Sequence, residues 1–249
     1  MKLFRTVRRH LLVSNNIKKY LIYALGEILL IVVGILIAWK INNFNELRKN
    51  KIIQEKIYVS LYEELHTNLG VLNTSIFQYK NNTTSLQNSL NYVGFCQESL
   101  TQEAKDLIVQ VKFKNTNLRS EALSSVNFTD KFQFLENDTV ADLIAEYPSE
   151  LKRFEQQELK IRSIIDNRLK PVLEEYISLK DLLPDDNDNF NQIRAFGQES
   201  NYIDLLNNKE YQNSVIDQLL QTQIQLNTAI NLRNKTEKLA IKLKQELDG

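Results

Sequence analysis

The chain has few of the residues that turn-rich folds and phosphate-binding loops require. Its 249 residues include only six glycines and three prolines. Two glycines lie in one apolar run and a third is the last residue, so only Gly70, Gly94 and Gly197 serve the remainder. Folds with many tight β turns, and loops that cradle phosphate, are rich in glycine. The composition therefore disfavours both and predicts an all-α protein.

Side chains that commonly carry catalysis or bind metals are equally scarce. Cys96 is the only cysteine, which excludes an intrachain disulfide, and we interpret it as a small, partly buried residue. His10 and His66 are the only histidines, and they flank the apolar run on opposite sides. A His-based metal site or triad within one chain is therefore not expected. No nucleotide-loop, hydrolase-elbow or kinase motif is present. We predict no catalytic residue, no metal ligand, no cofactor and no enzymatic activity.

Acidic residues are absent from the first 20 positions, although charge is balanced overall. The sequence holds 31 basic and 31 acidic residues, and all six charged side chains before Tyr20 are basic. The remainder therefore carries 25 basic against 31 acidic residues, a net charge of about −6. A nucleic-acid-binding body would present a basic face, so we expect no nucleic-acid partner.

The chain does have one long hydrophobic run, residues 21–39, which contains a single acid, Glu27. As a helix it would be about 28 Å long, close to the roughly 30 Å hydrocarbon core of a bilayer. A cleaved signal peptide has about 7 to 15 apolar positions and ends in small residues, whereas this run is longer and ends in Trp39 and Lys40. We therefore predict a retained transmembrane helix at residues 20–41. Its expected aromatic anchors at the headgroup level are Tyr20, Tyr23, Trp39 and Phe44.

Basic residues on the two sides of the run predict its orientation. Six precede it and five follow it within a similar distance, which favours a cytoplasmic N-terminus by the positive-inside rule. Residues 1–19 are then a cytoplasmic segment, and residues 42–249 form an extracytoplasmic domain. Residues 3–12 fit either an interfacial helix or an unstructured basic tail. The basic side chains expected to face lipid headgroups are Arg5, Arg8, Arg9, Lys18 and Lys19.

One side of the predicted transmembrane helix combines small residues with the single acid of the run. Ala24, Glu27, Ile31, Gly34 and Ala38 fall on it, and Gly34 and Ala38 are spaced as small residues that permit close helix approach. An acid inside a bilayer is costly and often functional. Glu27 is also only about 9 Å into the run, so it would reach the surface by snorkelling. We favour a helix-contact face over an ion path, because one helix cannot enclose a channel. A homo-oligomer or another membrane protein would satisfy this face equally well.

Beyond the run, apolar residues recur at helical spacing in three long stretches. The first, at residues 53–79, continues the membrane helix outward, either directly or with an interruption at residues 42–45, and ends at Gly94. Two short helices are expected within residues 101–113 and 120–126.

A third short helix is expected to start at Asp138 or Thr139 and to end at a break at Pro148. The second long stretch follows and continues to about Leu183, and Pro171 within it predicts a kink or a short interruption near Leu169 and Lys170. Residues 184–189 are the clearest loop, and the third stretch covers residues 201–247. The inward face of the second stretch is expected to include Leu151, Phe154, Leu159, Ile161, Ile164 and Leu179. Three long stretches predict an up-and-down antiparallel bundle.

The anchor region resembles a known family in three short patterns: Tyr23-Ala24-Leu25-Gly26-Glu27, Gly34-Ile35-Leu36-Ile37-Ala38 and Asn42-Asn43-Phe44-Asn45-Glu46. They are similar to those of uncharacterised single-pass membrane proteins of Gram-negative bacteria, a domain of unknown function. Phe44 stands where that family more often has tryptophan. The resemblance implies a bacterial inner membrane with a periplasmic C-terminal domain. It implies no activity, because none is assigned to the family.

These patterns together predict a membrane-anchored interaction or scaffold protein whose partners include the lipid bilayer. The alternative is a receptor-like sensor that binds a small ligand in its bundle and signals through a membrane partner, because 19 cytoplasmic residues cannot hold a signalling domain. A polar pocket between the long helices would favour the sensor. A packed core with an exposed apolar patch would favour the scaffold.

Overall fold

The computed structural model describes residues 17–95, 100–183 and 188–248. Every regular element in this part of the chain is helical, which confirms the predicted all-α fold. The chain divides into two compact units, Met1–Lys56 and Ile57–Gly249. The predicted interfacial segment, which contains Arg5, Arg8 and Arg9, lies outside the described residues, as does Cys96.

Helix α2 spans Ile17–Leu90 and contains the apolar run. In the described part of the chain it is the one helix that is long and apolar enough to cross a membrane, and none of its most apolar window is buried within the protein. The helix passes residues 42–45 without interruption. The sequence has no glycine or proline between Gly34 and Gly70, so no residue there ends the helix. After Leu90 a turn leads to Gly94, whose φ of +88° favours glycine.

Three long helices build the unit Ile57–Gly249: the part of α2 from Ile57, α5 (Asp138–Ile164) and α9 (Lys209–Asp248). Their buried positions follow alternating steps of four and three residues, the heptad spacing of helices that pack along their length. On α9 these positions are Tyr211, Val215, Gln218, Thr222, Gln225, Ala229, Leu232, Thr236, Leu239 and Leu243. On α2 they are Tyr58, Leu61, Leu65, Asn68, Leu72, Ser75 and Tyr79. On α5 they are Val140, Ile144, Tyr147, Leu151, Phe154, Glu158 and Ile161.

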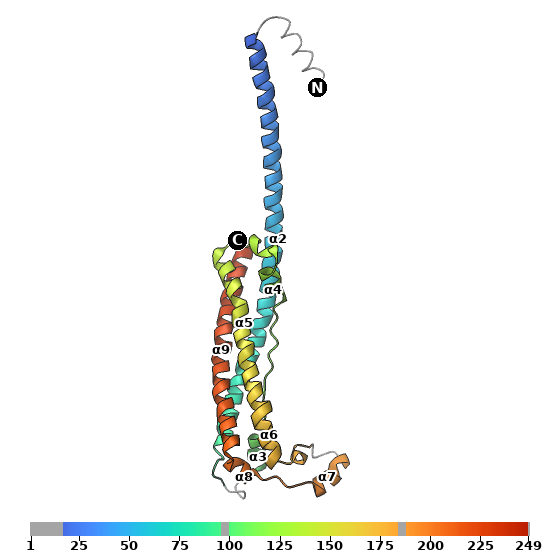
Figure 1. Ribbon diagram of the computed structural model, residues 1–249, viewed down its shortest axis with the longest axis vertical. Coiled ribbons are helices and arrows are strands. Elements are labelled where there is room, and N and C mark those ends of the chain that lie inside the picture. Colours follow the sequence, from blue (N-terminus) through green and yellow to red (C-terminus); the bar gives the residue numbers. More distant parts are fainter. Residues whose placement is uncertain (1–16, 96–99, 184–187, 249) are drawn as a thin grey trace. The chain divides into compact units, whose positions relative to one another are not determined.

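The directions of these helices depend on an extended segment, residues 110–119. Helix α9 runs antiparallel to α5, since Tyr147 contacts Thr236 (2.6 Å between hydroxyl oxygens) and Gln157 donates to the side chain of Gln221 (2.9 Å). Helices α2 and α5 run parallel, because the extended segment, rather than a helix, returns the chain alongside them (Figure 1). A single extended strand of chain therefore takes the place that a fourth helix has in a four-helix bundle.

Pro148 does not break α5, contrary to the prediction from sequence. A proline has no N–H group, so it leaves the carbonyl of the residue four positions earlier, Ile144, without its helical partner. Asn127, the last residue of α4 (Glu121–Asn127), donates its side-chain Nδ2 to the Ile144 oxygen at 3.2 Å. This tertiary hydrogen bond replaces the missing one, and the helix continues.

Pro171 does coincide with an interruption, as predicted. A π-helical turn, η3 (Ile165–Leu169), separates α5 from α6 (Lys170–Tyr176), which holds Pro171 in its first turn. The remaining elements are α3 (Gln102–Val109), η2 (Asp130–Phe134), η4 (Leu179–Leu182), η5 (Asp188–Phe190), α7 (Asn191–Phe196) and α8 (Tyr202–Asn207). The predicted short helices thus correspond to α3 and α4.

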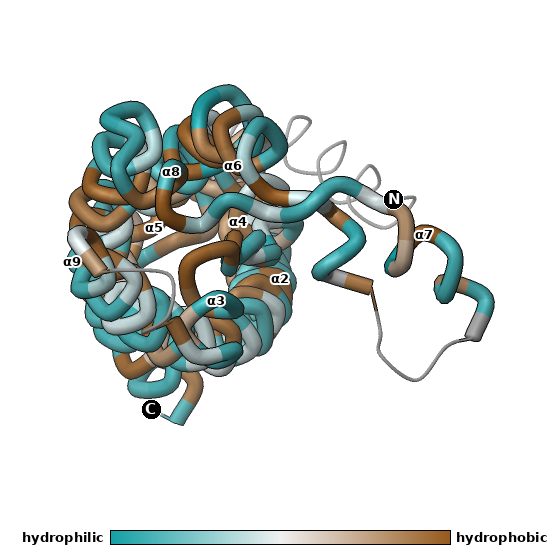
Figure 2. Tube along the Cα trace, turned by 90° about the horizontal axis from the view of Figure 1, so that it is seen from below, coloured by the Kyte–Doolittle hydropathy of each residue, from teal (hydrophilic) through white to brown (hydrophobic). Residues whose placement is uncertain are grey.

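Some side chains predicted to face inward are exposed. Leu159 and Leu179 are both more than half exposed, because the heptad seam of α5 passes through Glu158 instead of Leu159. Helix α7 lies to one side of the other helices of its unit (Figure 2), and its Phe196 is exposed. The apolar periodicity therefore located the helices but misplaced part of the buried face.

Replacement of Leu72 by alanine is expected to lower the free energy of unfolding by about 2 to 5 kcal/mol, because this fully buried side chain would leave a cavity. Phe77→Ala, on the exposed side of the same helix, is expected to change it by less than about 1 kcal/mol. Urea unfolding of the full chain in detergent, followed by helical circular dichroism, measures both. Equal losses would contradict the heptad assignment.

Candidate functional site

A layer of buried polar side chains lies between two apolar clusters of the bundle core. One cluster contains Leu72 and Phe154, and the other contains Leu205 and Tyr211. We define the polar layer as Ser75 and Tyr79 of α2, Thr116 of the extended segment, Glu158 of α5, and Gln218, Thr222 and Gln225 of α9. Burial of polar groups is costly unless they are hydrogen-bonded, so the partners of these side chains decide whether the layer is stable.

Glu158 connects three parts of the polar layer and is only 5% exposed. Its carboxylate accepts a hydrogen bond from the hydroxyl of Tyr79 at 2.5 Å. The backbone N–H of Thr116 donates to both of its oxygens, at 3.1 and 3.2 Å. None of the ion pairs of the described residues includes Glu158. Neutral donors alone therefore compensate this buried carboxylate.

Tyr79 extends the network from Glu158 to α9. Its hydroxyl lies 3.0 Å from the Thr116 hydroxyl and accepts a weaker hydrogen bond from Gln225 Nε2 at 3.4 Å. Burial, and then the hydrogen bond to Glu158, raise the pKa of Tyr79 well above its ordinary value. The hydroxyl is therefore a proton donor at neutral pH. The side-chain oxygens of Gln218 and Gln225 accept no hydrogen bond from the described residues although both side chains are buried, which is uncommon in a native core.

Side chains of the long helices hold the extended segment in place. Gln218 and Asn82 donate to the Lys112 carbonyl (3.2 and 3.4 Å), and Glu158 accepts from the Thr116 N–H. The Asn68 amide pairs with both backbone groups of Arg119 (2.8 Å each). Just beyond it, Glu64 accepts from the N–H groups of Ala122 and Leu123 (2.7 and 3.1 Å) at the start of α4. The buried polar side chains thus supply the hydrogen bonds that a strand partner would otherwise provide.

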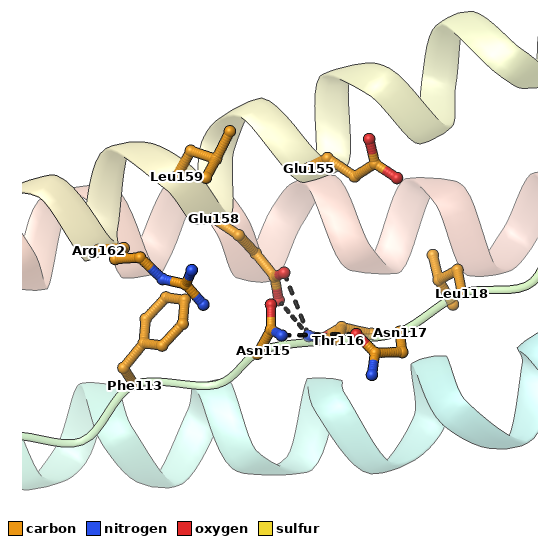
Figure 3. Close-up of a pocket in the computed structure, with 9 residues that line it drawn as sticks. All are labelled: Phe113, Asn115, Thr116, Asn117, Leu118, Glu155, Glu158, Leu159 and Arg162. Carbon is orange, nitrogen blue, oxygen red and sulfur yellow. Dashed lines mark hydrogen bonds between the residues drawn. The ribbon is translucent and has the colours of Figure 1, made fainter.

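A cleft of about 460 Å³ opens between the extended segment and α5 (Figure 3). Arg162 lies over the ring of Phe113 with its guanidinium carbon 4.7 Å from the ring centroid, and Glu155 lies two helical turns earlier on α5. Leu159, which is 58% exposed, lies between these two charges on α5. The lining residues are Phe113, Asn115, Thr116, Asn117, Leu118, Glu155, Glu158, Leu159 and Arg162. Through Glu158 and Thr116, the cleft shares residues with the polar layer.

The outer face of α9 is almost free of charge. Between Glu210 and Arg233 its sequence holds one charged residue, Asp217, which pairs with Arg168 at 2.7 Å. Exposed apolar side chains recur on this face every four residues: Ile216, Leu220 and Ile224. Depletion of charge around exposed apolar residues is typical of the centre of protein–protein interfaces.

Known protein families, curated proteins and solved structures were searched, and none matches this chain.

The helix-contact face predicted from sequence lies on α2. Ala24 and Glu27 are half-buried, whereas Ile31, Gly34 and Ala38 are exposed. Glu27 and Tyr23 each have an interaction within the chain. Of the other predicted membrane contacts, Trp39, Phe44 and Lys18 are exposed, and the side chains of Lys19 and Tyr20 lie outside the described residues.

Reasoning from sequence missed the polar layer and the cleft. The polar layer interrupts the apolar periodicity with Ser75 on α2 and with Gln218, Thr222 and Gln225 on α9. Their four–three spacing, continuous with Tyr211 and Leu232, was the available signal. The cleft had no local signal, because its two walls are separated by about 40 residues of sequence. In the described part of the chain, no group of three or more acidic, histidine or cysteine side chains is placed to hold a metal.

Glu158→Gln is expected to lower the free energy of unfolding by about 1 to 3 kcal/mol, because an amide nitrogen would face the Thr116 N–H in place of an acceptor oxygen. Glu155→Gln, one turn away and exposed, is the matched control and is expected to have little effect. Urea unfolding of the full chain compares them. An unchanged midpoint for Glu158→Gln would show that the carboxylate does not hold the extended segment.

Because several tyrosine side chains are buried, we expect the folded protein to lose stability at high pH. Burial raises the pKa of Tyr147 and of Tyr202 to about 12, and also raises the pKa of Tyr211. These side chains ionise near pH 10 when unfolded (about 10 for free tyrosine). Their contribution to stability is therefore intact below about pH 10 and is lost as the pH rises towards about 12. The sequence holds ten tyrosines, so tyrosinate absorbance reports the less buried ones as well. Its last phase should coincide with the loss of helical circular dichroism when the two are recorded together. Ionisation of these tyrosines without helix loss would contradict their burial.

Proposed function

We propose that this chain is a membrane-anchored, non-enzymatic interaction protein. The observation that carries the proposal is the apolar part of α2, whose most apolar window has no residue buried within the protein. So much exposed apolar surface is unfavourable in water and favourable in lipid. With the bias of basic residues before the run, this supports an N-terminus in the bacterial cytoplasm and a periplasmic unit 57–249.

The partner that we propose is a second copy of the chain. On α2, the exposed Gly34 and Ala38 permit close approach of an identical helix. On α9, Ile216, Leu220 and Ile224 form a ridge with a four-residue step, and two such ridges interdigitate in the commonest class of helix packing. The α9 ridge carries no charged residue. The α2 face carries one acid, Glu27, which lies seven residues, or about two helical turns, before Gly34. Both surfaces therefore support self-association.

A second candidate function is ligand sensing, which the cleft favours. Its volume is within the range of small-molecule sites. Its buried residue Glu158 is hydrogen-bonded to Tyr79, which lies on α2, the helix that also contains the apolar run. A ligand that altered the bonding of Glu158 would act on this helix directly. The cleft lies at the surface between the extended segment and α5, and so differs from the enclosed pocket expected of a sensor.

The proposed self-association through α2 is tested by chemical crosslinking in native membranes. Gly34→Leu is expected to reduce the crosslinked dimer several-fold, because a larger side chain separates the two helices. Gly26→Leu is the matched control: it makes the same change about 80° away around the helix. At both glycines an added Cβ meets no atom of the chain within 4 Å, so neither variant disturbs the fold.

Glu27→Gln, compared with the wild type, separates a role of the charge from that of the small residues. If Gly34→Leu loses the dimer while Glu27→Gln and Gly26→Leu keep it, close packing of the two helices at Gly34 holds the dimer together. Equal dimer in Gly34→Leu, Gly26→Leu and the wild type would contradict the proposed contact face. Extraction of the chain from membranes by alkaline carbonate would contradict the anchor itself.

A further inference from the structure

We propose that the cleft between the extended segment and α5 binds a short zwitterionic peptide of about three residues. The inference deepens the ligand-sensing candidate and rests on it, but it shares no residue with the contact face on α2. It depends on the charges, the apolar surface and the extended backbone that the cleft brings together.

The charges of the cleft are arranged as the two ends of a peptide require. Glu155 and Arg162 are seven positions apart on α5, so they lie on one side of the helix about 10 Å apart along its axis. Three extended residues span about the same length. The ammonium group of the peptide would meet Glu155, and its carboxylate would meet the guanidinium of Arg162, which makes charge-assisted bonds with carboxylates.

A second observation points to a positively charged group in the ligand. Glu158, a carboxylate that is 5% exposed and lines the cleft, forms no ion pair within the described residues. Its Oε1 already accepts from Tyr79 and Thr116, whereas its Oε2 accepts only from Thr116. One acceptor position of Oε2 is therefore open to the same ammonium group that meets Glu155, since the two glutamates are about one helical turn apart on α5. This ammonium group would compensate the buried charge.

The middle of the cleft suits the body of a peptide better than that of a single charged metabolite. Leu159 offers apolar surface between the two charges, and Phe113 lies beneath Arg162. The side-chain amides of Asn115 and Asn117 lie along the opposite wall, on the extended segment. The backbone of the extended segment bonds to the helices at Lys112, Thr116 and Arg119. The peptide would pair with backbone groups of the segment that lie between these bonds, as peptides add to an unpaired strand.

Isothermal titration of the full chain in detergent with trialanine tests the proposal. Trialanine is expected to bind, and N-acetyl-trialanine amide, which lacks both end charges, is expected to bind at least about tenfold more weakly. Free alanine carries both charges but cannot span the distance between Glu155 and Arg162, so it is also expected to bind at least about tenfold more weakly. Equal binding of the blocked peptide, equal binding of alanine, or no binding of trialanine at millimolar concentration would each overturn the proposal.

Two exposed residues of the cleft locate the binding without disturbing the core. Arg162→Gln and Glu155→Gln are each expected to weaken trialanine binding about tenfold. Arg153→Gln on α5 and Glu174→Gln on α6 are exposed residues outside the cleft and should leave it unchanged. If the control variants weakened binding as much as the cleft variants, the peptide would bind elsewhere and the proposal would fail.

Crosslinking in membranes with and without trialanine distinguishes this inference from the proposed function. A peptide that binds and changes the yield of dimer supports both the site and the sensing role. A peptide that binds but leaves the dimer unchanged supports the site and contradicts the sensing role. Failure of the peptide to bind overturns the proposed peptide site. It does not affect the proposed anchor and contact face on α2, which the glycine variants and the carbonate extraction test separately.

Discussion

The extended segment 110–119 imposes the constraint on which the bundle depends: its backbone groups are packed against helices and need hydrogen-bond partners. A helix satisfies its own backbone, and a strand is satisfied by its neighbour, but this segment has neither. Side chains at heptad positions of the three long helices supply the bonds instead, chiefly Asn68, Glu158 and Gln218. The polar layer follows from this need, since apolar residues at those positions would leave the segment unpaired.

The same segment determines the topology and creates the cleft. Because it returns the chain without a helix, α2 and α5 run parallel and α9 runs antiparallel to α5. A single extended chain is thinner than a helix, and the space beside it is the cleft lined by Phe113, Leu159 and Arg162. Glu158 belongs both to the cleft and to the core, so occupation of the cleft and packing of the core are energetically linked. This link is the physical basis of the sensing candidate.

The molecule has two exposed apolar surfaces, one on α2 and one on α9. The apolar part of α2 and the outer face of α9 differ in kind: the first is continuous enough to match the thickness of a bilayer, and the second is a narrow ridge between polar neighbours. In the proposed arrangement, confinement of two copies to one membrane would raise their effective concentration, so that a smaller contact area would be needed than in solution. The α2 and α9 surfaces proposed for self-association therefore support each other.

The sequence by itself determined the all-α class and the long apolar helix. It also determined the approximate extents of α3, α4 and the third long stretch, residues 201–247. All of these depend on local composition and on periodicity along one helix. It also located the interruption near Pro171. Only the tertiary structure decided that Pro148 leaves α5 intact, since the compensating donor is Asn127 on another helix. It alone decided that Glu158 rather than Leu159 is buried, and that residues 110–119 return as an extended chain. The reason is common to all three: whether a polar group can be buried depends on a partner distant in sequence, and periodicity along one helix carries no record of that partner.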